Sequence, residues 1–365
     1  MGEMRNRPKL QNIEFIRIFF AVSIVYFHLL HSFMIPFTEE TAVYQELAQQ
    51  SKYAKYIVEC FFIMSGYFLY RSVTLHSAQK TLDFVLKKLI RLWPVFAVST
   101  ILSVFFLDVP LQEGFLNLFF LQSTGLTTAW TGLNWYVSAF FFAELFYFLM
   151  YKAMKNSAGM KLIICLIVYF GYVLNIMYTD GGFARKVVFG VFSLAMARAA
   201  AGVGLGYLLG NLYDAVKERW AVLYVQRLNA SVVTVLITFI ETGSFCLLML
   251  DFFAGKKVGK NQFMVVVLFS VFFFCMLTEK GLFSRLISKL SVCRLGKYAY
   301  SIYVMQEISF YILEKTFWKN TGFLKRHAGV SLTVSVVFAA AVGAVIWHLV
   351  EKPASKLGKK ILLIE

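Results

Sequence analysis

Three ionisable side chains interrupt the first apolar stretch of the chain, which runs from Ile13 to Pro36 and contains Glu14, Arg17 and His28. Ionisable groups in a lipid-facing segment are costly, so they usually mark a protein-lined pathway or a reaction site. At about 100° per residue, the eleven steps from Arg17 to His28 return to within roughly 20° of the same direction, and Glu14 lies one turn before Arg17. A carboxylate, a guanidinium and an imidazole are therefore predicted to share one face of a helix.

The imidazole of His28 is the group on this face best suited to general base catalysis, because an imidazole accepts a proton near neutral pH. The alternative is a structural role, as a buried histidine whose hydrogen bonds are satisfied. Arg17 is suited to binding an anion, but it could instead pair with Glu14 or Glu59 and hold helices together. His31 points about 60° away from His28 on the helix, which favours a place at the membrane interface over a catalytic role.

The composition indicates that these residues belong to a membrane protein. Of 365 residues, 59% are hydrophobic and only 15% are charged, and the mean hydropathy of +0.68 is typical of a membrane-embedded chain. The net charge of +16 would suit nucleic-acid binding, but Lys and Arg occur in short clusters between apolar runs, where they orient membrane proteins. We therefore expect no nucleic-acid partner. The five cysteines have neither metal-ligand nor disulfide spacing, so no metal site is expected.

Ten segments are apolar and long enough to cross a bilayer as helices. They lie near residues 13–36, 53–70, 91–108, 134–151, 161–179, 187–212, 229–250, 262–278, 298–317 and 330–350. Lys and Arg are roughly twice as frequent in the connections on the side of the N-terminus, which indicates that both termini are cytoplasmic. The sequence thus predicts an all-α integral membrane protein of about ten transmembrane helices, forming one membrane domain over residues 1–365. The third span is predicted to continue a helix that begins near Leu82, and 112–128 is predicted to be re-entrant or interfacial.

Six short patterns occur in order along these segments. They are the Arg17 and His28 pair, Phe61–Leu69 (FFIMSGYFL), Lys87–Pro94 (KKLIRLWP), Asn134–Ser138 (NWYVS), Leu295–Tyr303 (LGKYAYSIY) and Glu351–Pro353 (EKP). Together they resemble the acyltransferase-3 family of membrane acyltransferases, many of which O-acetylate bacterial surface glycans. The resemblance extends over essentially the whole chain.

The resemblance implies an enzyme of the bacterial cytoplasmic membrane. It would transfer an acyl group, most often acetyl, from acyl-coenzyme A to a hydroxyl of a surface or lipid-linked glycan, with no tightly bound cofactor. His28 would be the general base, with a transient acyl-histidine as a variant of the mechanism. The residues that would hold the donor phosphates by charge-assisted hydrogen bonds are Arg17, Lys88 and Arg91. The further candidates, for support or for the acceptor site, are Glu14, Trp135, Tyr136 and Glu144.

Two positions depart from the family pattern. The basic motif, commonly Arg-x-x-Arg, is Lys88-x-x-Arg91 here, which keeps both charges but loses one bidentate guanidinium. Gln306 stands where members often carry a histidine, which puts a role for a second histidine there in doubt. Some relatives also carry an extracytoplasmic esterase-like domain, which this sequence is predicted to lack.

Several of these candidates have structural alternatives. Lys88 and Arg91 could serve only as orientation signals, and Trp135 and Tyr136 could be interfacial aromatic residues.

Two further pairs of residues suggest contacts between helices. Ser65 and Gly66 favour close helix packing over a serine nucleophile, since no Gly-x-Ser-x-Gly turn surrounds them. Glu144 and Arg198 are intramembrane charges of opposite sign, and we expect them to pair across helices.

Two other functional classes are compatible with the sequence. A transporter or flippase of a lipid-linked sugar also uses intramembrane charges near the midplane, but the sequence has no detectable repeat between its halves and no paired broken helices. A catalytically inactive relative that acts as a membrane sensor would suit the departures at Lys88 and Gln306. Transfer of label from acetyl-coenzyme A would distinguish the enzyme from both.

Overall fold

The computed structural model shows a bundle of helices over the described part of the chain, residues 10–34, 41–125, 132–179, 182–190, 192–224, 230–319 and 321–362. Residues 35 and 36, which end the first predicted span, lie outside the described residues, as do 126–128 of the predicted re-entrant piece. One antiparallel pair of two-residue strands, β1 (Val187–Val188) and β2 (Phe192–Ser193), precedes α9.

The helices follow one another along the chain with short connections. They are α1 (Gln11–His28), the π-helix η1 (Leu29–Met34), α3 (Ala42–Ser51), the 3-10 helix η2 (Ala54–Tyr56), α4 (Ile57–Leu75), α5 (Thr81–Phe106), α6 (Leu111–Leu118), α7 (Trp135–Met154), α8 (Ala158–Met177), α9 (Leu194–Tyr224), α10 (Ala230–Phe253), α11 (Phe263–Thr278), α12 (Leu282–Ser288), the 3-10 helix η3 (Ser291–Tyr298), α13 (Ala299–Lys315), the 3-10 helix η4 (Phe317–Lys319), α14 (Thr321–Arg326), α15 (Ala328–Ile346), the π-helix η5 (Trp347–Glu351) and α16 (Lys352–Ile361).

Each of the ten predicted segments overlaps a helix, namely α1, α4, α5, α7, α8, α9, α10, α11, α13 and α15. Among the described residues, six helical stretches are long and apolar enough to cross a membrane: Gln11–Met34, Thr81–Phe106, Trp135–Met154, Ala158–Met177, Ser231–Phe253 and Ala328–Ile361. A seventh results if α11 and α12, bent by 71° at their junction, form one broken span. The chain is an all-α membrane protein, whereas the count of ten spans and the cytoplasmic position of both termini stay predictions.

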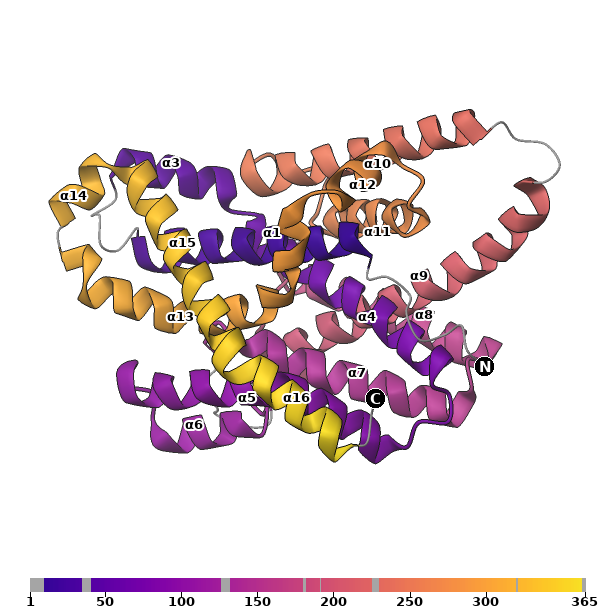
Figure 1. Cartoon of the computed structure of the whole chain (residues 1–365), viewed down its shortest axis with the longest axis horizontal. Helices are drawn as coiled ribbons and strands as arrows, with labels where there is room; N and C mark the ends of the chain where they lie inside the picture. The colour runs from indigo at the N-terminus through magenta and orange to yellow at the C-terminus, as the bar shows by residue number, and fades with distance from the viewer. Residues whose placement is uncertain are drawn as a thin grey trace.

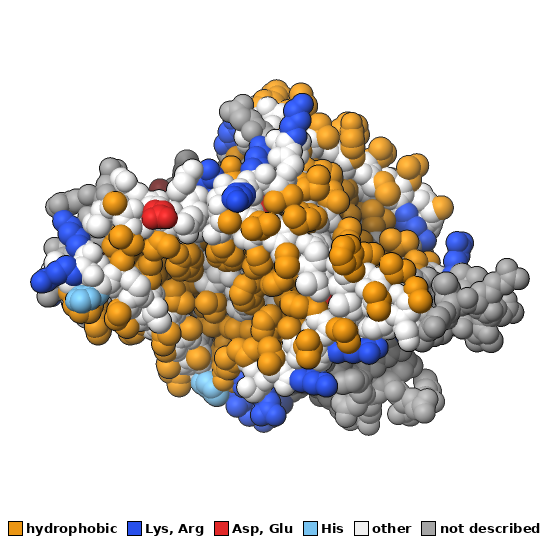
Figure 2. All heavy atoms as spheres, turned by 90° about the horizontal axis from the view of Figure 1, so that it is seen from above, with side chains coloured by type: hydrophobic (Ala, Val, Ile, Leu, Met, Phe, Trp, Pro, Cys, Tyr) orange, Lys and Arg blue, Asp and Glu red, His pale blue; other side chains and the backbone are white. Residues whose placement is uncertain are grey.

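Apolar side chains cover much of the outer surface of these helices. α10 exposes Val235, Leu236 and Phe239, and α8 exposes Leu162 and Leu166. Figure 2 shows hydrophobic side chains over most of one long face, with Lys and Arg mostly toward its margins. Such a face suits contact with lipid, because hydrocarbon accepts apolar side chains and strongly disfavours charged ones.

Two long helices, α4 and α9, approach each other through glycines. A Cβ atom at Gly66 of α4 would overlap the carbonyl oxygen of Val203, and a Cβ atom at Gly206 of α9 would overlap the carbonyl oxygen of Ile63. The contact is therefore reciprocal, with a glycine of each helix lying on the backbone of the other. Membrane helices commonly associate through small residues that allow such close approach. The predicted packing role of Gly66 is confirmed.

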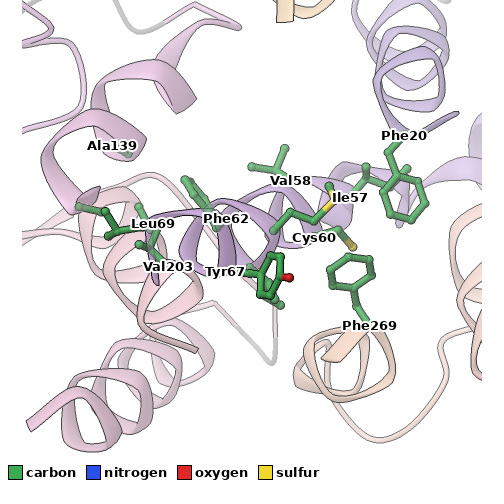
Figure 3. Packing of buried hydrophobic residues seen from close by; sticks show 14 of the residues in the cluster. Phe20, Ile57, Val58, Cys60, Phe62, Tyr67, Leu69, Ala139, Val203 and Phe269 are labelled. Atoms are coloured by element: carbon green, nitrogen blue, oxygen red, sulfur yellow. The ribbon is translucent and has the colours of Figure 1, made fainter. Parts of the chain in front are cut away.

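Helix α4 also lies at the centre of the buried apolar core. Figure 3 shows Ile57 and Cys60 of this helix together with Phe20 of α1 and Phe269 of α11. All four side chains are fully buried, and the ring centroids of Phe20 and Phe269 are 5.9 Å apart. This packing holds α1, and the ionisable stripe on it, in a defined place against α4.

Helix α5 is held between α13 and α16. The hydroxyl of Tyr300 on α13 donates to the carbonyl oxygen of Leu92 at 2.7 Å, and Gly358 of α16 lies directly on the side chain of Ile90. Figure 1 shows α16 crossing beside α5, and α6, where the predicted piece 112–128 begins, lying along it. These contacts bring the basic residues of α5 toward α1, α13 and α16.

Candidate active site

A cavity of about 470 Å³, called the inner cavity below, lies between α1, α4, α5, α7 and α13. The six residues from the predicted site that line it are Glu14, Arg17, Lys88, Arg91, Tyr136 and Glu144. They come from three helices that are far apart in the sequence, so their meeting is a property of the tertiary structure. His28 and Trp135, which the sequence also predicts for the site, do not line this cavity.

Two of the three predicted donor-binding cations are paired with carboxylates in the inner cavity. Nη1 of Arg17 lies 2.9 Å from Oε1 of Glu14, one turn away on the same helix. Nζ of Lys88 on α5 lies 2.5 Å from Oε2 of Glu144 on α7, whose side chain is almost fully buried. Arg91 is exposed at the edge of the cavity and forms no ion pair with the described residues.

The expected pairing of Glu144 with Arg198 is wrong. Nε of Arg198 on α9 donates to Oε1 of Glu59 on α4 at 2.6 Å, and both side chains are buried. The guanidinium carbon of Arg198 also lies 4.9 Å from the ring centroid of Trp135. Arg198 lies where α9 packs against α4, so it pairs with Glu59 of α4. The alternative pairing of Glu59 with Arg17 does not form, because Arg17 pairs with Glu14. Trp135 covers this buried ion pair.

Tyr136 and Tyr303 line the inner cavity next to each other. Along α13 the lining extends from Lys297, at the end of η3, to Tyr303. The ring of Tyr303 lies 5.6 Å from that of Tyr136, and its hydroxyl donates to the carbonyl oxygen of Leu133 at 2.7 Å. Gln306 lies nearly one turn further along α13. The inner cavity therefore ends near the part of α13 that carries Gln306.

His28 is the last residue of α1 before the π-helical turn η1. Its Nδ1 lies 3.0 Å from Oε1 of Gln306, whose side chain is fully buried. The eleven steps from Arg17 to His28 correspond to about 16 Å along the helix axis. The departure from the family pattern at Gln306 thus falls at the partner of the predicted base, and π-helical turns often occur at functional sites.

The amide orientation at Gln306 determines which nitrogen of His28 is available. With the amide oxygen of Gln306 turned toward Nδ1 of His28, that ring nitrogen carries the proton. Nε2 of His28 then keeps the lone pair that a general base needs. Nε2 of Gln306 has no hydrogen-bond partner in the part of the chain that the structure describes. The amide therefore acts on His28 through its oxygen alone.

His31 occupies a different environment from His28. Its Nδ1 lies 3.0 Å from the carbonyl oxygen of Phe27, and its Nε2 lies 3.1 Å from the carbonyl oxygen of Ala48. Both ring nitrogens face backbone carbonyls, so the side chain ties η1 to α3. This arrangement gives His31 a structural role, and its place at the membrane interface stays a prediction.

Four polar residues line the inner cavity without a role predicted from the sequence, namely Lys297, Tyr300, Tyr303 and Glu351. Oγ of Ser301 donates to Oε2 of Glu351 at 2.5 Å, which joins α13 to the π-helix η5. Nζ of Lys297 lies 4.7 Å from the ring centroid of Trp347. All four belong to the last two of the six sequence patterns, which could have identified them as candidates.

Replacing Gln306 with Leu is expected to lower kcat for acyl transfer about 10- to 100-fold, the range seen when a partner that orients a histidine is removed. Leu has similar length but cannot accept the Nδ1 proton, so His28 loses its fixed tautomer. Gln306→Glu keeps an acceptor at the same place and is expected to retain most of the activity. Steady-state kinetics of the purified variants in detergent would check this. Equal losses in the two variants would contradict the orienting role.

Comparison with known protein families gives one match. A family model described as an acyltransferase domain, that of the acyltransferase-3 family, matches residues 10–350. No curated protein and no solved structure gives a match. The matched range includes α1, α4, α5, α7 and α13, which line the inner cavity, and it ends before α16.

Proposed function

This chain belongs to the acyltransferase-3 family, and on that basis we propose that it transfers an acetyl group from acetyl-coenzyme A to a hydroxyl of a surface or lipid-linked glycan. The family match and the long apolar helices identify the chain as a multi-pass membrane acyltransferase. The proposed location is the bacterial cytoplasmic membrane, with ten spans and both termini in the cytoplasm. Family membership establishes an acyltransferase, and the donor, the acceptor and the catalytic residues are our proposals.

The observation that carries the proposal is the arrangement of polar groups along α1. Lys88 and Arg91 of α5 lie at the inner cavity at the level of Arg17 on α1, and the His28–Gln306 pair lies about 16 Å from Arg17 along the α1 axis. A donor with phosphates at one end and a thioester at the end of a long arm suits this spacing. Binding its phosphates by charge would position its carbonyl for attack, which lowers the entropic cost of the reaction.

In the proposed reaction, Nε2 of His28 accepts the proton of the acceptor hydroxyl while that oxygen bonds to the acetyl carbonyl carbon. The carbon–sulfur bond then breaks, and the leaving thiolate of coenzyme A takes the proton from His28. The products are an acetyl ester and free coenzyme A, and His28 returns to its starting state. Gln306 would hold the imidazole in the tautomer that this sequence of proton transfers requires.

The test is transfer of label by the purified protein in detergent, supplied with radiolabelled acetyl-coenzyme A and a panel of glycans and lipid-linked sugars. We expect label in an acceptor, released by mild alkali as expected for an ester, together with free thiol in equal amount. Failure of the folded protein to label any acceptor in the panel would count against the proposal. Transport of a glycan across the membrane of proteoliposomes that contain the protein, without acetylation, would favour the transporter class.

A further inference from the structure

A second cavity of about 350 Å³, called the outer cavity below, lies between the end of α4, the start of α5 and α16. It shares Lys88 and Arg91 with the inner cavity, so the two cavities are neighbours across these side chains. The basic residues in its lining are Lys87, Lys88, Arg91 and Lys359, with His76 beside them.

The two cavities differ in their balance of charge. The inner cavity has Glu14, Glu144 and Glu351 in its lining, and two of these carboxylates pair with its cations. No Asp or Glu occurs among the described residues that line the outer cavity. Phosphate groups are held by cations that are not already neutralised, so a polyanion fits the outer cavity better than the inner one. Arg17 and Lys88 are thereby less suited to bind phosphates than the sequence indicates.

Helix α16 completes the outer cavity. Gly358 is buried against the side chain of Ile90, where a Cβ atom would overlap its methyl groups. This close contact places the next residue, Lys359, at the cavity together with Lys87 and Arg91 of α5. Within the part of the chain that the structure describes, the partner of Lys87 is a neutral oxygen, that of the Gln79 side-chain amide, 3.2 Å from Nζ in the amide orientation that satisfies both groups. Among the described residues, Lys87, Arg91 and Lys359 therefore form no ion pair, so these three cations on two helices can bind an anionic ligand.

We propose that the outer cavity binds the phosphorylated nucleotide end of the acyl-coenzyme A donor, with Lys359 of α16 and Lys87 and Arg91 of α5 as its cationic ligands. The uncharged arm of the donor then passes Arg91 into the inner cavity, and the thioester points toward His28. This inference rests on the proposed function, because it takes acyl-coenzyme A as the donor. It adds a binding element, α16, that lies beyond the residues matched by the family model.

The test compares two donors that carry the same thioester, acetyl-coenzyme A and acetyl-pantetheine, of which only the first has the nucleotide. Purified wild type, Lys359→Gln and Lys87→Gln would be assayed in a neutral detergent free of anionic lipid. Each substitution is expected to lower the ratio of kcat/KM for acetyl-coenzyme A to that for acetyl-pantetheine about tenfold, the loss of one charge-assisted contact. The matched control is Lys356→Gln, an exposed lysine on the same helix outside the cavity lining.

A direct binding measurement keeps this inference separate from the proposed function. Desulfo-coenzyme A, which has the nucleotide but no thiol, is expected to bind wild type by calorimetry and to bind Lys359→Gln about tenfold more weakly. If no acetyl transfer occurs from either donor, the proposed function fails. The difference in desulfo-coenzyme A affinity still decides whether the outer cavity binds the nucleotide. Equal donor ratios and equal affinities in wild type and Lys359→Gln would overturn the inference. An equal loss in Lys356→Gln, or a loss seen only when anionic lipid is added, would overturn it in favour of general surface charge or lipid headgroup binding.

Discussion

His28→Ala is expected to lower kcat for acetyl transfer by about 100- to 10⁴-fold, the contribution typical of a positioned general base. The imidazole is oriented through Nδ1 by Gln306 at 3.0 Å, which leaves Nε2 for the acceptor hydroxyl. Alanine removes the proton acceptor and leaves the phosphate end of the donor untouched. The affinity for desulfo-coenzyme A should therefore stay within about twofold of wild type, because an unaffected site binds with unchanged free energy.

Initial rates of label transfer, measured at saturating donor with wild type, His28→Ala and His28→Gln, would check this prediction. His28→Gln keeps a polar side chain next to Gln306 but accepts no proton near neutral pH, so it should be as inactive as His28→Ala. His31→Gln serves as the matched histidine control, since His31 faces two backbone carbonyls and not the donor path. Activity of His28→Ala close to that of wild type would remove His28 from the mechanism.

Gly66→Ala is expected to destabilise the folded protein by about 3 kcal/mol, the upper end of the usual range for overpacking a well-packed interior. The added Cβ atom would overlap the carbonyl oxygen of Val203, which belongs to the backbone of α9 and cannot move as a side chain can. The helices would have to separate, and the reciprocal contact of Gly206 with Ile63 would be lost with them. Because α4 also packs against α1, this change would disturb the site as well.

The matched control for this prediction is Gly243→Ala in α10. A Cβ atom at Gly243 meets no atom within 4 Å, and alanine is favoured over glycine in a helix by roughly 0.5–1 kcal/mol. Thermal unfolding and size-exclusion chromatography in detergent would compare the variants. We expect a large loss of the folded monodisperse fraction for Gly66→Ala and no loss for Gly243→Ala. Equal melting temperatures for the two variants would contradict the close contact of Gly66 with the backbone of α9.

The pairing of Arg17 with Glu14 and of Lys88 with Glu144 changes the chemical interpretation of the inner cavity. The sequence assigns the donor phosphates to these cations, but each has a carboxylate within ion-pair distance. A cavity with this balance suits an uncharged arm and a reacting carbonyl. The cations that form no ion pair among the described residues lie next to it, and Arg91 lines both cavities.

Local sequence patterns predicted much of the fold and part of the site. Long apolar runs predicted ten helical segments, and each of them overlaps a helix of the structure. This works because the preference of an apolar helix for lipid depends on that segment alone. Helical periodicity placed Glu14, Arg17 and His28 on one face, since the angle between residues of one helix follows from their spacing alone. The repeat Gly202, Gly206, Gly210 on α9 is a further signal in the sequence, because glycines four residues apart form a small-residue face on a helix.

Contacts between helices were decided by the tertiary structure alone. The partners of Glu144 and Arg198 depend on how α4, α5, α7 and α9 pack, and spacing along one helix contains no information about that. The same is true of Gln306, which reaches His28 only because α13 packs against α1, and of Lys359, which reaches α5 only because Gly358 allows α16 to approach Ile90. The sequence by itself determined which residues could do chemistry and on which helix face they lie. Packing decided which of them meet, because opposite charges and small residues have several possible partners until the helices are in contact.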